Sequence, residues 1–321
     1  MKIKIIGFSV TGFGKPSFPV VLQTKFDENR IDNQVSYTSL GGLSIDSLPF
    51  LMDTIMGNDA YDVAVLELTT SWFSKFHSDI KYAHGFLEYI VNYLCSKNIE
   101  VVFLNLYRRD IDDNDVVVRV IDEFYAKLSH VIDLKSQTRI KYTSTGDDGT
   151  TDGVHPKPEA IMYIADELYN FFITYNKALC LPFPIAELGT LNILVQPEII
   201  KENEYIFSSR HGLTLSSRKL ISNKYYCFLP PNDVHVTGIF FIYGPDTGLV
   251  TLEIEDDIVE IKMYDEMSFY RRLGYTKLPC PISNKNLILS VHKLDDVKLQ
   301  HEPREKVNGV NAYIAGFSCL K

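Results

Sequence analysis

The sequence has little of several features that mark particular classes of protein. It contains no uninterrupted apolar run of about 18 residues, so no transmembrane helix is predicted. It carries 32 Lys and Arg against 41 Asp and Glu, for a formal net charge of −9. It therefore lacks the basic surplus that is typical of nucleic-acid-binding proteins, and no nucleic-acid partner is expected.

Cysteine is also scarce, and its spacing fits neither a disulfide framework nor a zinc site. The five cysteines are far apart, their number is odd, and none forms a C-x-x-C pair. We therefore expect reduced thiols, no bound metal and no cofactor. The opening residues hold only the apolar pair Ile5-Ile6 before a glycine, which is too short for the core of a signal peptide. Together these features predict a cytoplasmic location.

The composition is that of a folded protein with material for two domains. The chain has 321 residues, 45% of them hydrophobic and 12% aromatic. In residues 1–178, short apolar runs alternate with segments of helical spacing, which predicts a parallel sheet covered by helices. The predicted strands are Ile3–Phe8, Gln34–Thr38, Val63–Leu68, Val101–Asn105 and Val131–Leu134.

Residues 179–321 have a different pattern, which predicts a smaller all-β sandwich domain. Short strands follow one another closely and are separated by turn signals such as Gly244-Pro245. The predicted strands are Val236–Tyr243, Leu249–Glu255, Ile258–Tyr264, Leu287–His292 and Ala312–Ser318. The aromatic residues of this domain suggest a glycan-binding role, with oligomerisation as the alternative, and the segment from Tyr264 to Arg272 is the best candidate for an exposed polar-aromatic patch.

Two short motifs in the first domain carry side chains that can do chemistry. Asp152 and His155 stand three residues apart just before the last predicted helix. A carboxylate can orient an imidazole, which then acts as a general base near neutral pH. Ser9 follows the first predicted strand, at the sheet edge where open α/β sheets bind ligands. Taken alone, Asp152 and His155 equally fit a capped turn followed by a plain loop histidine. Taken alone, Ser9 fits an ordinary strand-ending serine in a glycine-rich turn better than a nucleophile.

Taken together, these residues resemble the SGNH, or GDSL, hydrolase superfamily. The resemblance covers residues 1–178, and its most specific piece is the segment Asp152-Gly153-Val154-His155-Pro156. It implies a flavodoxin-like three-layer fold with Ser9, Asp152 and His155 as the catalytic triad. The first block reads Gly7-Phe8-Ser9, so the acidic neighbour of the serine is missing. The second block, Leu40 to Ser44, offers Gly42 as the oxyanion-hole glycine.

The third family block, G-x-N-D after the third strand, has no literal counterpart at that place. Gly57-Asn58-Asp59 precedes the strand and is therefore rejected. Ser71 stands where the family has its Asn, and its hydroxyl can donate one hydrogen bond. The predicted oxyanion hole is thus Ser9, Gly42 and Ser71, with Thr70 as a substitute for Ser71. A slow enzyme or a site that has lost hydrolysis also fits this departure.

The resemblance implies acyl transfer through Ser9, and we expect a serine esterase that cleaves a small acyl ester. An acetyl group on a carbohydrate is the preferred substrate by family habit. Two alternatives stay open: an O-acyltransferase that modifies a surface polysaccharide, and a non-catalytic glycan-binding or assembly protein with a degenerate site. Weaker candidates for substrate binding are Thr70, Trp72 and Tyr107. Whether the protein forms a homo-oligomer is left open.

Overall fold

The structure is a computed structural model. It describes residues 1–70, 80–107, 116–126, 130–134, 153–175, 191–195, 204–209, 212–228, 230, 234–254, 257–265, 267–268, 270–283, 285–293, 299–303 and 310–320. The chain divides into two compact units, Met1–Glu187 and Leu188–Lys321. The boundary predicted between residues 178 and 179 lies close to this division, and both points fall outside the described residues.

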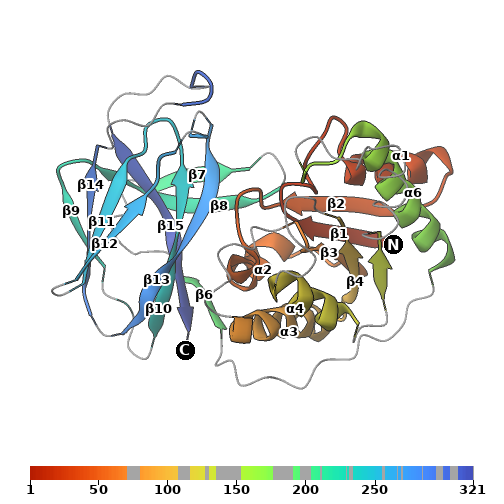
Figure 1. Ribbon diagram of the computed structural model, residues 1–321, viewed down its shortest axis with the longest axis horizontal. Helices are drawn as coiled ribbons and strands as arrows, with labels where there is room; N and C mark the ends of the chain where they lie inside the picture. The colour runs from red at the N-terminus through yellow and green to blue at the C-terminus, as the bar shows by residue number, and fades with distance from the viewer. Residues whose placement is uncertain are drawn as a thin grey trace. The chain divides into compact units, whose positions relative to one another are not determined.

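The first unit is built on a parallel sheet with the strand order β2-β1-β3-β4-β5 (Figure 1). Its strands are β1 (Lys2–Gly7), β2 (Gln34–Ser39), β3 (Val63–Glu67), β4 (Glu100–Asn105) and β5 (Val131–Asp133). Every neighbouring pair is parallel. These strands are rich in buried Val, Ile and Leu because helices cover both faces of the sheet. Each strand predicted in this part of the sequence overlaps an observed one.

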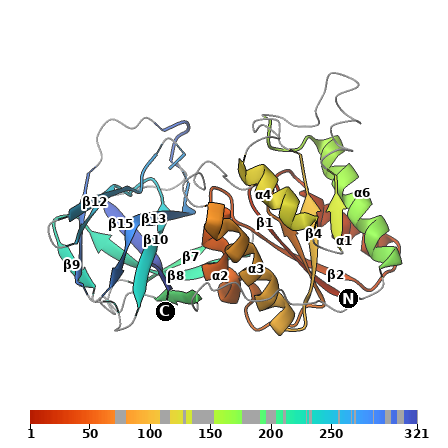
Figure 2. The same ribbon diagram turned by 60° about the horizontal axis from the view of Figure 1, so that its bottom comes forward.

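Helices pack on both faces of this sheet and make a three-layer domain (Figure 2). The helices are α1 (Phe18–Glu28), α2 (Leu48–Met56), α3 (Ile80–Ser96), α4 (Val116–Tyr125) and α6 (Pro158–Thr174), with a short 3₁₀ helix, η1 (Ile45–Ser47), before α2. On one face α1 contacts α6 through Phe26 and Tyr169, whose ring centroids lie 5.6 Å apart. On the other face Phe103 of β4 contacts Phe124 of α4 at 5.8 Å. The predicted flavodoxin-like fold is confirmed.

The second unit consists of two antiparallel sheets. One has the order β13-β10-β15-β8-β7, with β6 beside β15, and the other has the order β12-β11-β14-β9. The strands are β6 (Leu191–Val195), β7 (Glu204–Ser208), β8 (Thr214–Ile221), β9 (Tyr225–Phe228), β10 (His235–Tyr243), β11 (Leu249–Ile254), β12 (Asp257–Lys262), β13 (Arg272–Ser283), β14 (Leu287–His292) and β15 (Asn311–Leu320). One apolar core joins the two sheets, and Phe228 of one stacks on Phe317 of the other at 4.5 Å. The all-β domain is confirmed as a sandwich.

Sequence patterns identified only part of this second unit. Strand β13 was missed because it contains Pro279 and Pro281, which interrupt the strand signal. It tolerates them as the edge strand of its sheet, and the ladder with β10 is irregular between Val236 and Gly238.

The expectation of reduced thiols is corrected at Cys95 in the first unit, which is disulfide-bonded. Disulfides are rare in reducing compartments, so the cysteines no longer support the cytoplasmic location, which stays a prediction.

Candidate active site

The candidate site lies at the carboxyl edge of the parallel sheet. The order β2-β1-β3 shows that the chain leaves β1 towards β2 and later returns on the other side of β1 with β3. Such a reversal is a topological switch point, where open α/β sheets bind their ligands. Ser9 stands two residues after the end of β1 and therefore lies at this point.

The loop after β2 packs against Ser9. A methyl group added at Gly41 would lie 3.7 Å from the Cα of Ser9 and 3.8 Å from its Cβ. Gly42 has a φ of 84°, and the N–H of Leu43 donates to the carbonyl of Leu40 at 3.0 Å. This is a tight turn whose third residue needs a left-handed backbone, which explains a glycine at that position. The two glycines of the second block therefore border the serine.

His155, which stands near the other end of this domain's sequence, contacts the loop that carries Ser9. Its ring stacks on that of Phe13 with a centroid distance of 4.4 Å and an interplanar angle of 26°. Phe13 stands four residues after Ser9. In the same region Val154 packs on the core that includes Val10. The fold thus brings the segment with the imidazole onto the loop with the serine, although the two are far apart in sequence.

A buried carboxylate that sequence analysis overlooked ties the strand ends together. Glu67, the last residue of β3, has no exposed surface. Its carboxylate accepts hydrogen bonds from the hydroxyl of Thr70 at 2.7 Å and the N–H of Thr70 at 3.1 Å. The hydroxyls of Thr11 and Thr69 and the N–H of Phe8 also donate to it, at 3.3, 3.4 and 3.5 Å. The only signal for it in the sequence is an acidic residue that ends an otherwise apolar strand.

The Glu67 network spans three neighbouring strands. Thr11 and Phe8 follow β1, Thr69 and Thr70 follow β3, and Thr69 in turn accepts a hydrogen bond from the N–H of Leu106 after β4 at 3.0 Å. Burial raises the pKa of Glu67 above its ordinary value, and the hydrogen bonds from Thr70, Phe8 and Thr11 partly oppose that rise. The carboxylate therefore acts as a common acceptor that fixes the loops around Ser9.

The remaining predicted site residues are placed unequally. Thr70 is buried, and its hydroxyl is directed to Glu67 rather than to the surface. Tyr107 follows β4 at the same sheet edge and is partly exposed. Asp152, Ser71 and Trp72 lie outside the described residues. The rejected triplet that begins at Gly57 does precede β3: Gly57 caps the end of α2, and its N–H donates to Asp53 O at 2.9 Å.

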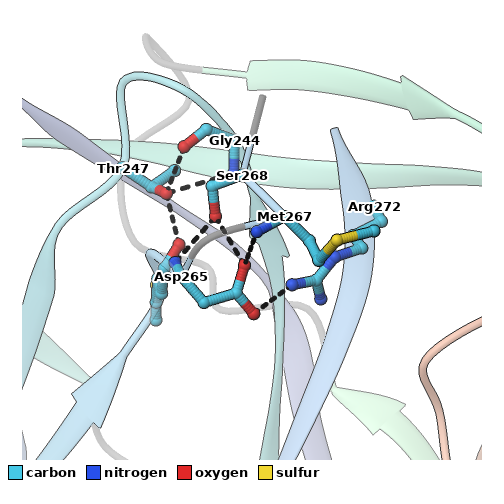
Figure 3. Close-up of polar contacts among 7 residues, drawn as sticks. Gly244, Thr247, Asp265, Met267, Ser268 and Arg272 are labelled. Atoms are coloured by element: carbon cyan, nitrogen blue, oxygen red, sulfur yellow. Dashed lines mark hydrogen bonds and ion pairs between the residues drawn. The ribbon is translucent and has the colours of Figure 1, made fainter. Parts of the chain in front are cut away.

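In the second unit, the predicted polar-aromatic patch is engaged with its own domain. Figure 3 shows Asp265 as an acceptor for the N–H of Met267, the hydroxyl of Ser268 and the guanidinium of Arg272. Arg272 also lies over the ring of Tyr243, 3.7 Å from its centroid. These contacts order the connection between β12 and β13, so its polar groups serve the fold.

The part of the chain that the structure describes also bears on a metal site and on a membrane-spanning segment. No three His, Cys, Asp or Glu side chains gather there as metal ligands would. No helix there has the length and apolar composition that crossing a membrane requires.

No protein-family model matches the sequence, and no curated protein matches it in sequence. Among solved structures, a two-domain esterase active on acetylated mannans, co-crystallised with mannopentaose, has 10% identity and a TM-score of 0.70, covering 99% of this chain and 90% of its own. A further structure of a two-domain esterase active on acetylated mannans has 10% identity and a TM-score of 0.69, over 99% and 91% of the two chains. A lipolytic G-D-S-L family member from Veillonella parvula has 18% identity and a TM-score of 0.46, over 55% and 100%.

The likeness to the two-domain esterases extends over both units of this chain. At 10% identity the likeness concerns the path of the backbone. The chain therefore shares the two-domain fold of those esterases. In this chain a parallel α/β domain is followed by an antiparallel all-β domain.

Proposed function

We propose that this chain is a serine esterase that hydrolyses a small acyl ester, with an acetyl group on a carbohydrate as its substrate class. The observation that carries the proposal concerns the loop after β1. That loop holds Ser9 at the switch point of the sheet and lies against the glycine turn after β2. The ring of Phe13 in the same loop stacks on the ring of His155. A nucleophile, a base and backbone donors are the groups that acyl transfer through serine requires.

The first half of the reaction forms an acyl-enzyme. His155 removes the proton of the Ser9 hydroxyl as its oxygen bonds to the ester carbonyl carbon, while Asp152 orients the imidazole. The N–H groups of Ser9 and Gly42, with the hydroxyl of Ser71, stabilise the negative charge on the former carbonyl oxygen. When the tetrahedral intermediate collapses, the bond to the alcohol breaks and His155 returns its proton to the leaving oxygen.

The second half releases the acyl group and restores the serine. His155 takes a proton from water as the water oxygen bonds to the acyl carbon. The intermediate collapses by breaking the bond to Ser9, whose oxygen receives the proton back from His155. The products are a carboxylic acid and free enzyme, so no external oxidant, reductant or cofactor is consumed.

The fold supports a carbohydrate ester as the substrate class. The solved esterase that resembles both units of this chain is described as active on acetylated mannans. The substrate class is carried over from that esterase by analogy of fold. Acetylated mannan is accordingly the first polymer to test, with acetylated xylan beside it.

The experiment measures acetate release from p-nitrophenyl acetate and acetylated mannan by the full chain and by its Ser9→Ala variant. We expect the variant to lose turnover of both substrates because it has no nucleophile. Ser96→Ala is the matched control, since Ser96 is exposed at the end of α3 and donates to a backbone carbonyl there. Undiminished release by the Ser9→Ala variant would end the assignment.

Two further measurements separate the alternative functions. A fluorophosphonate probe labels an activated serine, so labelling of the wild type but not of the Ser9→Ala variant argues against a degenerate binding protein. Product analysis with an acyl donor and a sugar acceptor distinguishes the other pair. Free acid as the main product supports hydrolysis, and an acylated sugar as the main product would instead identify an O-acyltransferase.

A further inference from the structure

The backbone of Phe8, between β1 and Ser9, is held by hydrogen bonds from both sides. Its carbonyl oxygen accepts a hydrogen bond from the hydroxyl of Ser39 at 2.7 Å, and its N–H donates to Glu67 Oε2 at 3.5 Å. Ser39 ends β2 and Glu67 ends β3, the two strands that flank β1, and both side chains are buried. The residue before the proposed nucleophile is therefore fixed by side chains of both neighbouring strands.

These two hydrogen bonds mark the point where the chain turns out of the sheet. In a regular strand, the N–H and C=O of one residue face the same neighbouring strand. At Phe8 they face opposite strands, β3 and β2. The carbonyl of Gly7 already accepts the N–H of Leu40 at 2.9 Å, so two successive carbonyls face the end of β2. The Ser39 hydroxyl supplies the donor for the second one.

The orientation of this carbonyl sets the orientation of a second group. The C=O of Phe8 and the N–H of Ser9 belong to one planar peptide group. This peptide is trans, because Lys15-Pro16 is the one cis peptide bond among the described residues. In a trans peptide the C=O and the N–H point in opposite directions. The hydrogen bond from Ser39 therefore turns the N–H of Ser9 away from β2 and keeps it there.

We propose that Ser39 is a positioning residue for the oxyanion hole: by holding the carbonyl of Phe8, its hydroxyl fixes the direction of the Ser9 N–H. The inference rests on the proposed function, in which that N–H stabilises the oxyanion. A donor that must align with charge developing in the transition state affects kcat rather than substrate binding. Ser39 acts through the peptide and does not contact the substrate.

The test compares Ser39→Ala, which removes the hydroxyl, with Ser39→Thr, which retains it. For Ser39→Ala we expect kcat on p-nitrophenyl acetate to fall about tenfold or more, with KM unchanged within about twofold, because removing an oxyanion donor outright costs about 10²–10³ in kcat. Ser39→Thr should recover most of the lost kcat. The control is Ser36→Ala on the same strand, whose hydroxyl donates to Tyr61 at 3.2 Å, and it should leave kcat unchanged.

A second readout does not depend on turnover. Hydrogen exchange of the backbone from Gly7 to Gly12 should be faster in Ser39→Ala than in the wild type or in Ser36→Ala, because the loop has lost its anchor. The positioning role would be overturned if kcat of Ser39→Ala were unchanged. It would also be overturned if KM rose by as large a factor as kcat fell. If the wild type and Ser9→Ala are equally inactive, the esterase function has failed, and exchange alone then judges the anchor: unchanged exchange refutes it and faster exchange supports it.

Discussion

The two units of this protein each bury a carboxylate, and they do so in different ways. Glu67 in the first unit accepts hydrogen bonds from backbone N–H groups and threonine hydroxyls, and in the described part of the chain all these partners are neutral. Asp246 in the second unit pairs with the guanidinium of Arg271 at 3.0 Å. It also accepts hydrogen bonds from Tyr313 at 2.6 Å and Asn311 at 2.9 Å.

The difference follows from what surrounds each carboxylate. The partners of Asp246 lie on strands and at strand ends, and Arg271 also lies over the rings of Tyr205 and Tyr313 at 5.2 and 4.7 Å. This cluster locks packed elements to one another. The partners of Glu67 lie on the loops that leave β1 and β3, beside the proposed nucleophile. A carboxylate without a buried cation is costly, and here its hydrogen bonds hold loops that carry reacting groups.

The largest effect is expected in the second unit, from Asp246→Ala. This change removes the carboxylate that pairs with the largely buried side chain of Arg271, and breaking a buried ion pair from one side costs about 3–5 kcal/mol. Urea unfolding should show a loss of that size, while ester turnover per folded molecule stays unchanged. Glu260→Ala on the exposed face of β12 is the control, with little change in stability. Lost turnover at full folding would show that the Asp246 cluster is not purely structural.

A smaller loss of stability, joined to a loss of activity, is expected from Glu67→Gln. The amide cannot accept both backbone N–H groups that now face the two carboxylate oxygens, and one unsatisfied buried donor costs about 1–3 kcal/mol. Turnover of p-nitrophenyl acetate should fall as the loops around Ser9 lose their common acceptor. Glu28→Gln, at the exposed end of α1, should change neither quantity. A stable variant with full turnover would contradict the role given to Glu67.

The wild type and the Glu67→Gln variant should also differ in how their stability depends on pH. Burial raises the pKa of Glu67 above the ordinary value of 4.5, so the folded state holds its proton more tightly than the unfolded state. The contribution of this group to stability is therefore complete below the unfolded pKa and is lost as pH rises through the folded pKa. Within that window the stability advantage of the wild type over Glu67→Gln should shrink by up to about 1.4 kcal/mol per pH unit. Parallel profiles of unfolding free energy against pH would contradict this.

The sequence predicted the first unit well because its signals are local. Each strand is a short apolar run that ends in a polar or glycine-containing loop, and Ser9 and Gly42 stand just past such ends. The pattern also places the segment with His155 before the last helix, α6. Parallel strands bring their carboxyl ends to one edge, so sequence order alone indicates which loops meet there.

The parts that sequence analysis missed depend on tertiary contacts. Glu67 is a single charge in an apolar strand, and its role emerges only when Thr11 and Thr70 converge on it. Ser39 differs from any other strand-ending serine only through its contact with Phe8. In the second unit, Arg271 and Arg272 suggested a solvent-facing patch, yet both find partners in their own domain. Charge and aromatic content do not reveal the direction in which a side chain points.

The smallest effect concerns the ring on which His155 stacks. Phe13→Leu keeps an apolar side chain but removes the aromatic face that lies 4.4 Å from the imidazole centroid. Stacked rings contribute about 0.5–1.5 kcal/mol beyond the area they bury, so the rate of fluorophosphonate labelling should fall by up to about tenfold. Tyr243→Leu makes the corresponding change in the second unit, where it removes the ring under Arg272. Labelling should be unaffected in that control, because its stack orders a connection between strands and not a reacting group. Equal losses in the two variants would mean that the stacks act through general stability, and the functional contrast between the units would then fail at this point.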